Sequence, residues 1–438
     1  MILAYLFIIG AVIGSFLNVC IYRIAAVHLT ITDEPKKLLP RLRWIFANVW
    51  LQLQSLWERP SQCPRCRTDI KWADNIPIFG WLKLGGRCRQ CKMWISPRYP
   101  AIELLNALLW VVVFWMEVPM GWNATLSESS LFTEIGPQTY PGLDWMSPEF
   151  FVLARYLFHM ILIEALLVAS IIDLDHRVIP DATTVPFMFV GLIGSTVLGR
   201  VHLMPVLYHN SHLMKSFTYV TPEWLHPLMA GPDVPAWVST YPHLHGFAVS
   251  LAGLLVGGGI TLAVRRIGRW GLGKEAMGDG DVVLMAMMGA FLGWQPIVIS
   301  FFVAAAVALL VVVITSPTRL SGMIAYGPYL SVGGVLVLLA WKRVWAQFEL
   351  IFSLGVLLIP ITAIGLLTFV GSLLFVTALK RLLGFSDAYS NAYWRAADQT
   401  WFFSGEKVDR HTGNWRKKDW DGCASGRGQI FEDRWRGR

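Results

Sequence analysis

Charged residues are scarce in this chain. They make up 15% of its 438 residues, whereas hydrophobic residues make up 55% and the mean hydropathy is +0.51. A soluble domain carries about 25% charged residues. The shortage argues against an ordinary soluble protein, and long apolar runs separated by charged loops predict an all-α polytopic membrane protein. The net charge of +8 fits basic loops at the membrane, so we expect no nucleic-acid partner.

Basic residues are missing from two places where their absence is informative. No Lys or Arg precedes the first apolar run, at about 1–21, so this run lacks the basic start of a cleaved signal peptide. We expect a first helix with its N-terminus outside. The loop at about 118–150 also has no Lys or Arg, whereas fourteen occur from Arg23 to Arg98. The positive-inside rule then places the first loop in the cytoplasm and the second outside.

Cysteines are few, and four of the six form two CxxC pairs in the first loop. Cys63 and Cys66 make one pair, and Cys88 and Cys91 make the other. Each pair can place two sulfurs on one ion, and two pairs complete a tetrahedral thiolate site. The pattern predicts a structural zinc site rather than a disulfide scaffold. A redox role for either pair is the weaker alternative.

Apolar runs along the chain predict eight or nine transmembrane helices. After the first run they lie near 101–117, 151–172, 183–199, 245–264, 282–293, 296–315, 324–341 and 350–379. We therefore expect four parts, which are a first transmembrane helix at 1–23, a cytoplasmic zinc-binding loop domain at 24–100, a membrane core with an extra C-terminal span at 101–379, and a cytoplasmic tail at 380–438.

Aspartates occur at two predicted helix ends that both face the cytoplasm. Asp173 lies in the segment 171–181, and Asp281 closes the motif Gly278-Asp279-Gly280-Asp281. A charged residue at the centre of a membrane helix costs roughly 2.5–3.5 kcal/mol, so such residues need a reason. Two carboxylates brought together can share a proton, one acting as base toward water and the other as acid. The alternative, that these aspartates only cap helices, stays open on position alone.

Two further charged residues flank the start of the run at 101–117. Arg98 and Glu103 could pair with each other, anchor the loop or contact a substrate, and anchoring is favoured.

The motifs together resemble the type IV prepilin peptidases, a branch of the GxGD membrane aspartyl proteases. The resemblance extends to about residue 341. It rests on an ordered set, namely Gly14-Ser15-Phe16-Leu17-Asn18, the two CxxC pairs, Asn75-Ile76-Pro77, Ser96-Pro97-Arg98-Tyr99-Pro100, Glu103-Leu104-Leu105, the two aspartate motifs and Tyr326-Gly327-Pro328-Tyr329.

This resemblance implies an activity and a location. The family cleaves leader peptides from type IV prepilins or type II secretion pseudopilins in the bacterial inner membrane, and the matching catalytic pair is Asp173 and Asp281. It also N-methylates the new N-terminus with S-adenosylmethionine, an activity associated with the cysteine loop. The implied partners are these substrates and the lipid bilayer. Two departures are Val283, where the family usually has Lys, and Gly80, where serine is common.

Two alternatives remain beside the bifunctional enzyme. One is a peptidase without methylation. The other is a zinc-containing membrane scaffold or transporter, which would be expected to carry ionisable residues deep in several helices. The predicted spans contain few such residues, which counts against transport.

Overall fold

The computed structural model describes residues 1–30, 38–57, 61–63, 66, 68–118, 148–219, 221–229, 231–272, 277–315 and 325–382. Most of the predicted outer loop at 118–150 and nearly all of the predicted tail at 380–438 lie outside the described residues.

Each predicted apolar run coincides with a helix. The nine helices are α1 (Ile2–Thr30), α4 (Arg98–Glu117), α5 (Pro148–His176), α6 (Val185–Leu198), α10 (Pro242–Leu272), α11 (Asp279–Leu292), α12 (Trp294–Thr315), α13 (Gly327–Leu339) and α15 (Leu358–Leu382). Within the described ranges, seven helices are long and apolar enough to cross a membrane, whereas α11 and α13 have only 14 and 13 residues. The predicted class, an all-α polytopic membrane protein, is confirmed.

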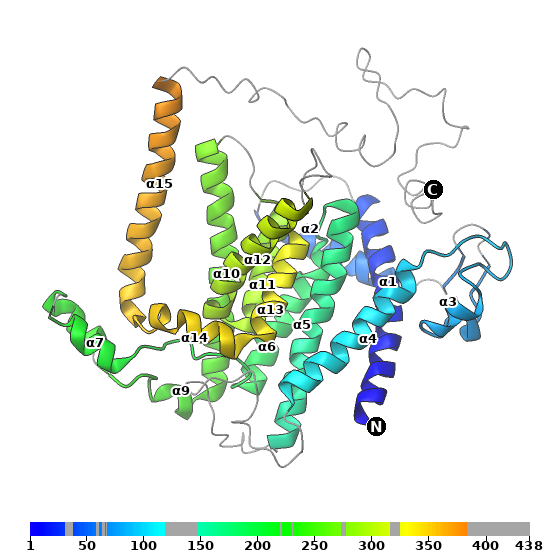
Figure 1. The fold of residues 1–438 in the computed structure, drawn as a ribbon, viewed down its shortest axis with the longest axis horizontal. Helices are drawn as coiled ribbons and strands as arrows, with labels where there is room; N and C mark the ends of the chain where they lie inside the picture. The colour runs from blue at the N-terminus through cyan, green and yellow to red at the C-terminus, as the bar shows by residue number, and fades with distance from the viewer. Residues whose placement is uncertain are drawn as a thin grey trace. The chain divides into compact units, whose positions relative to one another are not determined.

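Several short helices lie outside the predicted spans. Helix α2 (Leu38–Gln54) falls within the first loop, α3 (Phe79–Lys83) follows the first CxxC pair, and α7 (Ser211–Phe217), α8 (His226–Met229) and α9 (Trp237–Thr240) occupy the stretch between α6 and α10. Helix α14 (Trp341–Phe352) is amphipathic, because Trp341, Trp345 and Phe352 are buried while Lys342 and Arg343 are exposed. It runs across the bundle rather than along it (Figure 1).

Contacts divide the chain into two compact units. One contains residues 1–10 and 106–374, and the other contains 11–105 and 375–438. In the first unit, α5, α6, α10, α11, α12 and α13 pack into a bundle (Figure 1). The second unit includes the cysteine loop, and its described part has no β-strand, only the isolated bridges Gln62–Asp69 and Arg87–Trp94.

Glycines allow α10 and α11 to touch backbone to backbone. A Cβ on Gly253 would lie 2.0 Å from the carbonyl oxygen of Gly289, and a Cβ on Gly289 would lie 2.0 Å from the carbonyl oxygen of Gly253. Small residues at such crossings are the usual basis of helix packing in membranes, where apolar side chains gain little by leaving lipid. This close packing fixes α11, whose first turn carries Asp281, against α10.

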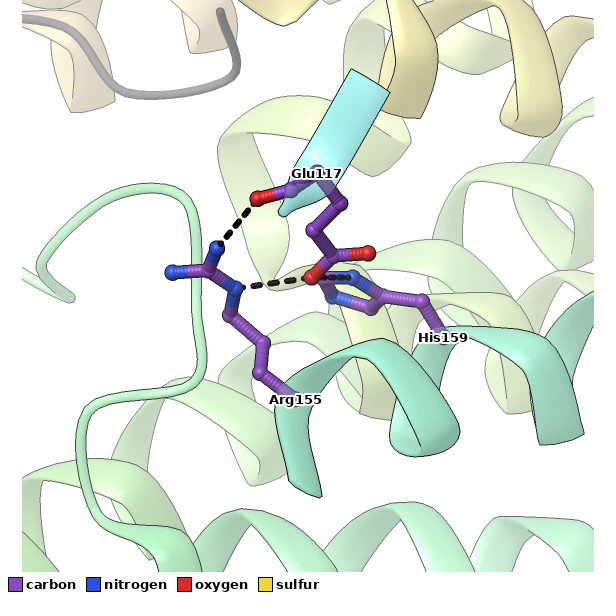
Figure 2. Close-up of polar contacts among 3 residues, drawn as sticks. All are labelled: Glu117, Arg155 and His159. Atoms are coloured by element: carbon purple, nitrogen blue, oxygen red, sulfur yellow. Dashed lines mark hydrogen bonds and ion pairs between the residues drawn. The ribbon is translucent and has the colours of Figure 1, made fainter. Parts of the chain in front are cut away.

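A fully buried ionic cluster joins the end of α4 to the first half of α5 (Figure 2). Arg155 Nε donates to Glu117 Oε1 at 2.7 Å, and its Nη2 donates to the Glu117 carbonyl oxygen at 3.2 Å. His159 Nδ1 lies 2.8 Å from the same Glu117 Oε1. Arg155 and His159 are four residues apart, so they share one face of α5. Charges this deeply buried are tolerated because they compensate each other.

Removing the negative charge from this cluster should destabilise the bundle. Glu117→Gln leaves the Arg155 guanidinium facing a neutral amide, and breaking a buried ion pair costs roughly 3–5 kcal/mol. We expect a clearly lower unfolding temperature in detergent, measured by intrinsic tryptophan fluorescence. The matched control is Glu223→Gln, because Glu223 is exposed. Equal unfolding temperatures for the two variants would contradict the structural role of the cluster.

Candidate functional site

Asp173 lies near the end of α5 and is held by the start of α13. Its side chain is only 6% exposed, and its Oδ2 accepts a hydrogen bond from the Gly327 backbone N–H at 3.0 Å. The helix ends three residues later, because Arg177 has a positive φ of 54° and donates its N–H to the Asp173 carbonyl oxygen at 2.8 Å. A left-handed residue of this kind is a common helix terminator, although it is usually glycine.

Asp281 lies in the first turn of α11. It is 8% exposed, and its Oδ2 accepts from the Gly278 backbone N–H at 3.0 Å. This bond satisfies a donor that the helix cannot use, and the helix N-terminus favours a negative charge. The glycine-rich motif therefore holds a carboxylate at a defined place beside α11.

One side chain links the two aspartate segments. A Cβ on Gly280 would lie 2.9 Å from the Cβ of Ile179, and a Cβ on Gly327 would lie 3.0 Å from its Cδ1 and 2.7 Å from Asp173 Oδ2. Any residue larger than glycine at these two positions would therefore push on Ile179, and at position 327 also on Asp173. Helices α5, α11 and α13 contact one another, and the charge of Asp281 acts on Asp173. The fold thus brings the two predicted residues into one site.

Burial separates these aspartates from their acidic neighbours. Asp173 and Asp281 are the buried aspartates in the described part of the chain. Asp279, by contrast, has a side chain that is 64% exposed and forms an ion pair with Arg265 of α10, whose Nη2 donates to Asp279 Oδ2 at 2.9 Å. Asp175 and Asp181 are half-exposed. Neither burial nor this ion pair could be read from the sequence, where all five aspartates occupy similar helix ends.

Two further groups lie within electrostatic range of the pair. The side chain of Tyr326, which precedes α13, lies within range of the negative charge of Asp281. The positive charge of Arg177 acts on Asp173. The absence of a lysine at Val283 therefore does not leave the site without a nearby cation.

The four predicted cysteines converge in the second unit. Cys63 Sγ lies 3.8 Å from Cys91 Sγ, Cys66 Sγ lies 3.9 Å from Cys88 Sγ, and all four sulfurs lie within 4.8 Å of one another. Four thiolates around zinc at about 2.3 Å would be separated by about 3.8 Å. The spacing therefore fits a tetrahedral zinc site. Hydrogen bonds to Thr68 lower the pKa of Cys66 to about 6, and the bond to the Thr68 side chain contributes more than the bond to its backbone. This lower pKa favours the thiolate form.

The two CxxC segments are equivalent hairpins, each closed by the same three contacts. In the first, the Cys63 N–H donates to the Thr68 carbonyl, the Ile70 N–H donates to Ser61, and Gln62 bridges Asp69. The second hairpin repeats these contacts 25 residues later. The Cys88 N–H donates to the Met93 carbonyl, the Ile95 N–H donates to the Gly86 carbonyl, and Arg87 bridges Trp94. Two matched turns of this kind are typical of a zinc ribbon.

An ion pair ties the second hairpin to the segment before α3. Arg89 Nε donates to Asp74 Oδ2 at 2.6 Å, and this bond from Arg89 lowers the pKa of Asp74. The backbone of Asp74 also explains why position 80 is a glycine, because a Cβ there would lie 2.2 Å from the Asp74 carbonyl oxygen. A serine at position 80, as is common in the family, would clash with this backbone.

Two buried charged features were not predicted as such. The cluster of Glu117, Arg155 and His159 could have been suspected from an Arg and a His four residues apart in an apolar run. Glu103 was noted, but its contacts were not. It accepts from the Ile78 N–H at 2.7 Å rather than pairing with Arg98.

Fold and site together define a multi-pass membrane protein with two buried aspartates at helix ends and a four-cysteine cluster. The chain matches the model of the bacterial peptidase A24 N-terminal domain over residues 8–117 and that of the type IV leader peptidase family over residues 160–314.

Curated relatives extend this similarity to most of the chain. A prepilin leader peptidase/N-methyltransferase from Aeromonas hydrophila is 30% identical over 76% of this chain and 89% of its own length. Another from Pseudomonas aeruginosa is 28% identical over 78% and 92%, and a type 4 prepilin-like proteins leader peptide-processing enzyme from Escherichia coli is 28% identical over 74% and 89%. No solved structure matches the chain. The chain belongs to the type IV leader peptidase family and is an enzyme of that family.

Removing one thiolate should empty the cysteine site of metal. We expect the purified full-length protein to contain about one zinc per chain, and Cys66→Ser and Cys88→Ser to lose most of it, because structural zinc sites need four protein ligands. Elemental analysis of protein purified without added metal is the measurement. Cys20→Ser is the control, because Cys20 lies on α1 and outside the cluster. A wild-type protein free of zinc would contradict the assignment.

Proposed function

We propose that this protein cleaves leader peptides from type IV prepilins or type II secretion pseudopilins, with Asp173 and Asp281 as its catalytic carboxylates. The observation that carries the proposal is the burial of these two aspartates in one site, at the ends of two different helices. The names of the relatives, which refer to prepilins and prepilin-like proteins, support this substrate class.

The geometry suits two carboxylates acting as acid and base. Each has one oxygen held by a backbone N–H, from Gly327 for Asp173 and from Gly278 for Asp281. The remaining oxygens can share a proton, since two nearby carboxylates resist carrying two negative charges. One carboxylate then takes a proton from water as it attacks the scissile carbonyl, and the other donates a proton to the leaving amide nitrogen.

The order of the spans supports a common membrane side for the cysteine loop and both aspartates. Helices α1, α4, α5, α6 and α10 follow one another as successive crossings. The loop before α4, the end of α5 and the start of α11 then face the same side. The basic residues of the first loop favour the cytoplasmic side of a bacterial inner membrane, with the N-terminus outside. A prepilin would present its leader on this side, with its apolar stretch in the membrane.

We further propose that the enzyme N-methylates the new N-terminus and that zinc shapes the loop domain associated with this step. The relatives are named N-methyltransferases as well as peptidases. S-adenosylmethionine, when bound, would supply the methyl group. Four thiolates leave no open position on zinc, so the metal serves folding rather than chemistry.

Two alternatives are less well supported. A peptidase without methylation would share every feature of the aspartate site. A zinc-containing scaffold or transporter would not require two buried aspartates beside each other, and a transporter would carry ionisable residues along a path through the bundle. Buried Asp, Glu, Lys and Arg side chains are instead few among the described residues, because Glu117 pairs with Arg155, Asp173 lies in one site with Asp281, and Glu103 completes the set. The buried histidines are His159, His202 and His245.

Either aspartate should be essential for cleavage. We expect Asp173→Asn and Asp281→Asn each to lower the cleavage rate of a co-expressed prepilin at least about 100-fold, because each removes the acid or base. Gel mobility of the prepilin measures the processing. Asp279→Asn is the matched control, since it changes an exposed, ion-paired aspartate two residues away. Normal cleavage by either of the first two variants would disprove the assignment.

Methylation can be separated from cleavage by the mass of the product. We expect mature pilin from cells with the wild-type enzyme to carry one methyl group on its N-terminal nitrogen, and pilin from cells with Cys88→Ser to be cleaved but undermethylated. Intact-mass spectrometry of the mature pilin gives both answers. Unmethylated mature pilin from the wild type would favour the peptidase-only alternative.

A further inference from the structure

Buried charge points to a second binding site in the chain. Five Asp, Glu, Lys or Arg residues are buried in the described part, and they are Glu103, Glu117, Arg155, Asp173 and Asp281. Glu117 and Arg155 compensate each other, and the two aspartates form the proposed catalytic pair. Glu103 is the member of this set that neither feature uses.

Glu103 has a backbone hydrogen-bond donor but no cation partner among the described residues. It lies in the second turn of α4, is 8% exposed, and accepts from the Ile78 backbone N–H at 2.7 Å. No Lys, Arg or His among the described residues forms an ion pair with it. A carboxylate offers about four lone-pair positions, and the Ile78 N–H uses one of them, so about three remain for a further donor. A partly buried carboxylate of this kind favours a cationic ligand.

The turn that Glu103 holds is strained. Ile78 has φ 62° and ψ −55°, and the Phe79 N–H donates to the Pro77 carbonyl at 2.6 Å, which defines a γ-turn of the rare positive-φ type. A β-branched residue in this region is an outlier. Such strain persists only where surrounding contacts enforce it, and it concentrates at ligand sites. The Glu103 carboxylate is one of those contacts.

The same turn presents an apolar surface. Ile76, Phe79 and Leu82 have side chains that are 43%, 69% and 58% exposed. A buried carboxylate beside a turn that exposes apolar side chains suits a ligand with one positive charge at the end of an apolar segment. Leader cleavage produces such a group, because the mature chain begins with a free α-ammonium followed by its apolar stretch.

We propose that Glu103 binds the α-ammonium group of the leader-free pilin, which is the methyl acceptor. The inference rests on the proposed function and names the acceptor side of its second reaction. Glu103 would hold the nitrogen in place through Oε1, the carboxylate oxygen that does not accept from Ile78. The ordinary pKa of an α-amino group, about 7.7–8.0, leaves a fraction of it near neutral pH as the neutral amine, which has given its proton to water and can accept a methyl group. Glu103 would position this nitrogen rather than remove its proton, because a carboxylate is a much weaker base than an amine.

Peptide binding without a methyl donor tests the site directly. The probe is a synthetic peptide with the apolar N-terminal stretch of a mature pilin, prepared with a free and with an acetylated N-terminus. We expect the full-length wild type in detergent at pH 7 to bind the free form about tenfold more tightly, as for one charge-assisted hydrogen bond in a partly buried site. The preference should fall as the pH rises above about 8, where the amine becomes neutral.

Two glutamate variants show whether the preference comes from Glu103. Glu103→Gln keeps an acceptor for the Ile78 N–H but removes the charge, so the two peptides should bind equally. Glu164→Gln is the matched control, because Glu164 is also partly buried and accepts from Trp110 Nε1 at 2.8 Å. It should keep the tenfold preference. In cells, Glu103→Gln should still cleave prepilin and should raise the unmethylated fraction of mature pilin.

The outcomes separate this inference from the proposed function. Equal binding of the two peptides to the wild type overturns the inference without the need for any variant. A retained preference in Glu103→Gln overturns it as well, because a purely structural Glu103 would give that result. A wild type that cleaves prepilin while failing the peptide test leaves the proposed peptidase intact. A wild type that cleaves no prepilin overturns the proposed function itself.

Discussion

The cost of burying a carboxylate is the constraint on which the rest of this structure depends. A membrane protein has little water inside to solvate a charge, so each buried acid needs a counter-charge, hydrogen-bond donors or a chemical purpose. Four buried acids meet this constraint in three ways. Glu117 has a counter-charge in Arg155, Asp173 and Asp281 lie in one site with a backbone N–H each, and Glu103 has the backbone N–H of Ile78.

The buried acids serve different purposes at the two ends of α5. The cluster around Glu117 fixes the first half of α5, whereas Asp173 lies 14 residues beyond His159, or about 21 Å along the same helix. A rigid α5 therefore carries a carboxylate to a position set by packing at its other end. The glycines that replace side chains at positions 253 and 289 do the same for α11. Catalytic geometry in a membrane enzyme depends on such distant packing, because the site itself is too small to enforce its own shape.

Apolar runs were sufficient to predict the nine main helices, since a span needs about 20 apolar residues and little else. The two CxxC pairs were sufficient to predict the cysteine cluster, because the local turn brings two sulfurs together at each pair. The choice of Asp173 and Asp281 over their neighbours needed a family resemblance. Burial is decided by which segments pack together, and no local pattern distinguishes Asp281 from Asp279. The amphipathic α14 was missed because its 12 residues are too few to span and too polar to read as a core helix.

Long-range contacts explain the remaining gaps. Glu117 meets Arg155 across 38 residues, and Ile78 meets Glu103 across 25, so neither contact follows from periodicity. The positive φ of Ile78 is still less predictable, because isoleucine is among the residues least suited to it. That mismatch is informative. Where a local preference is violated, another contact must hold the backbone, and here it is the Glu103 carboxylate. Glu103 is therefore more than a loop anchor, because its carboxylate also shapes the apolar turn at Ile78.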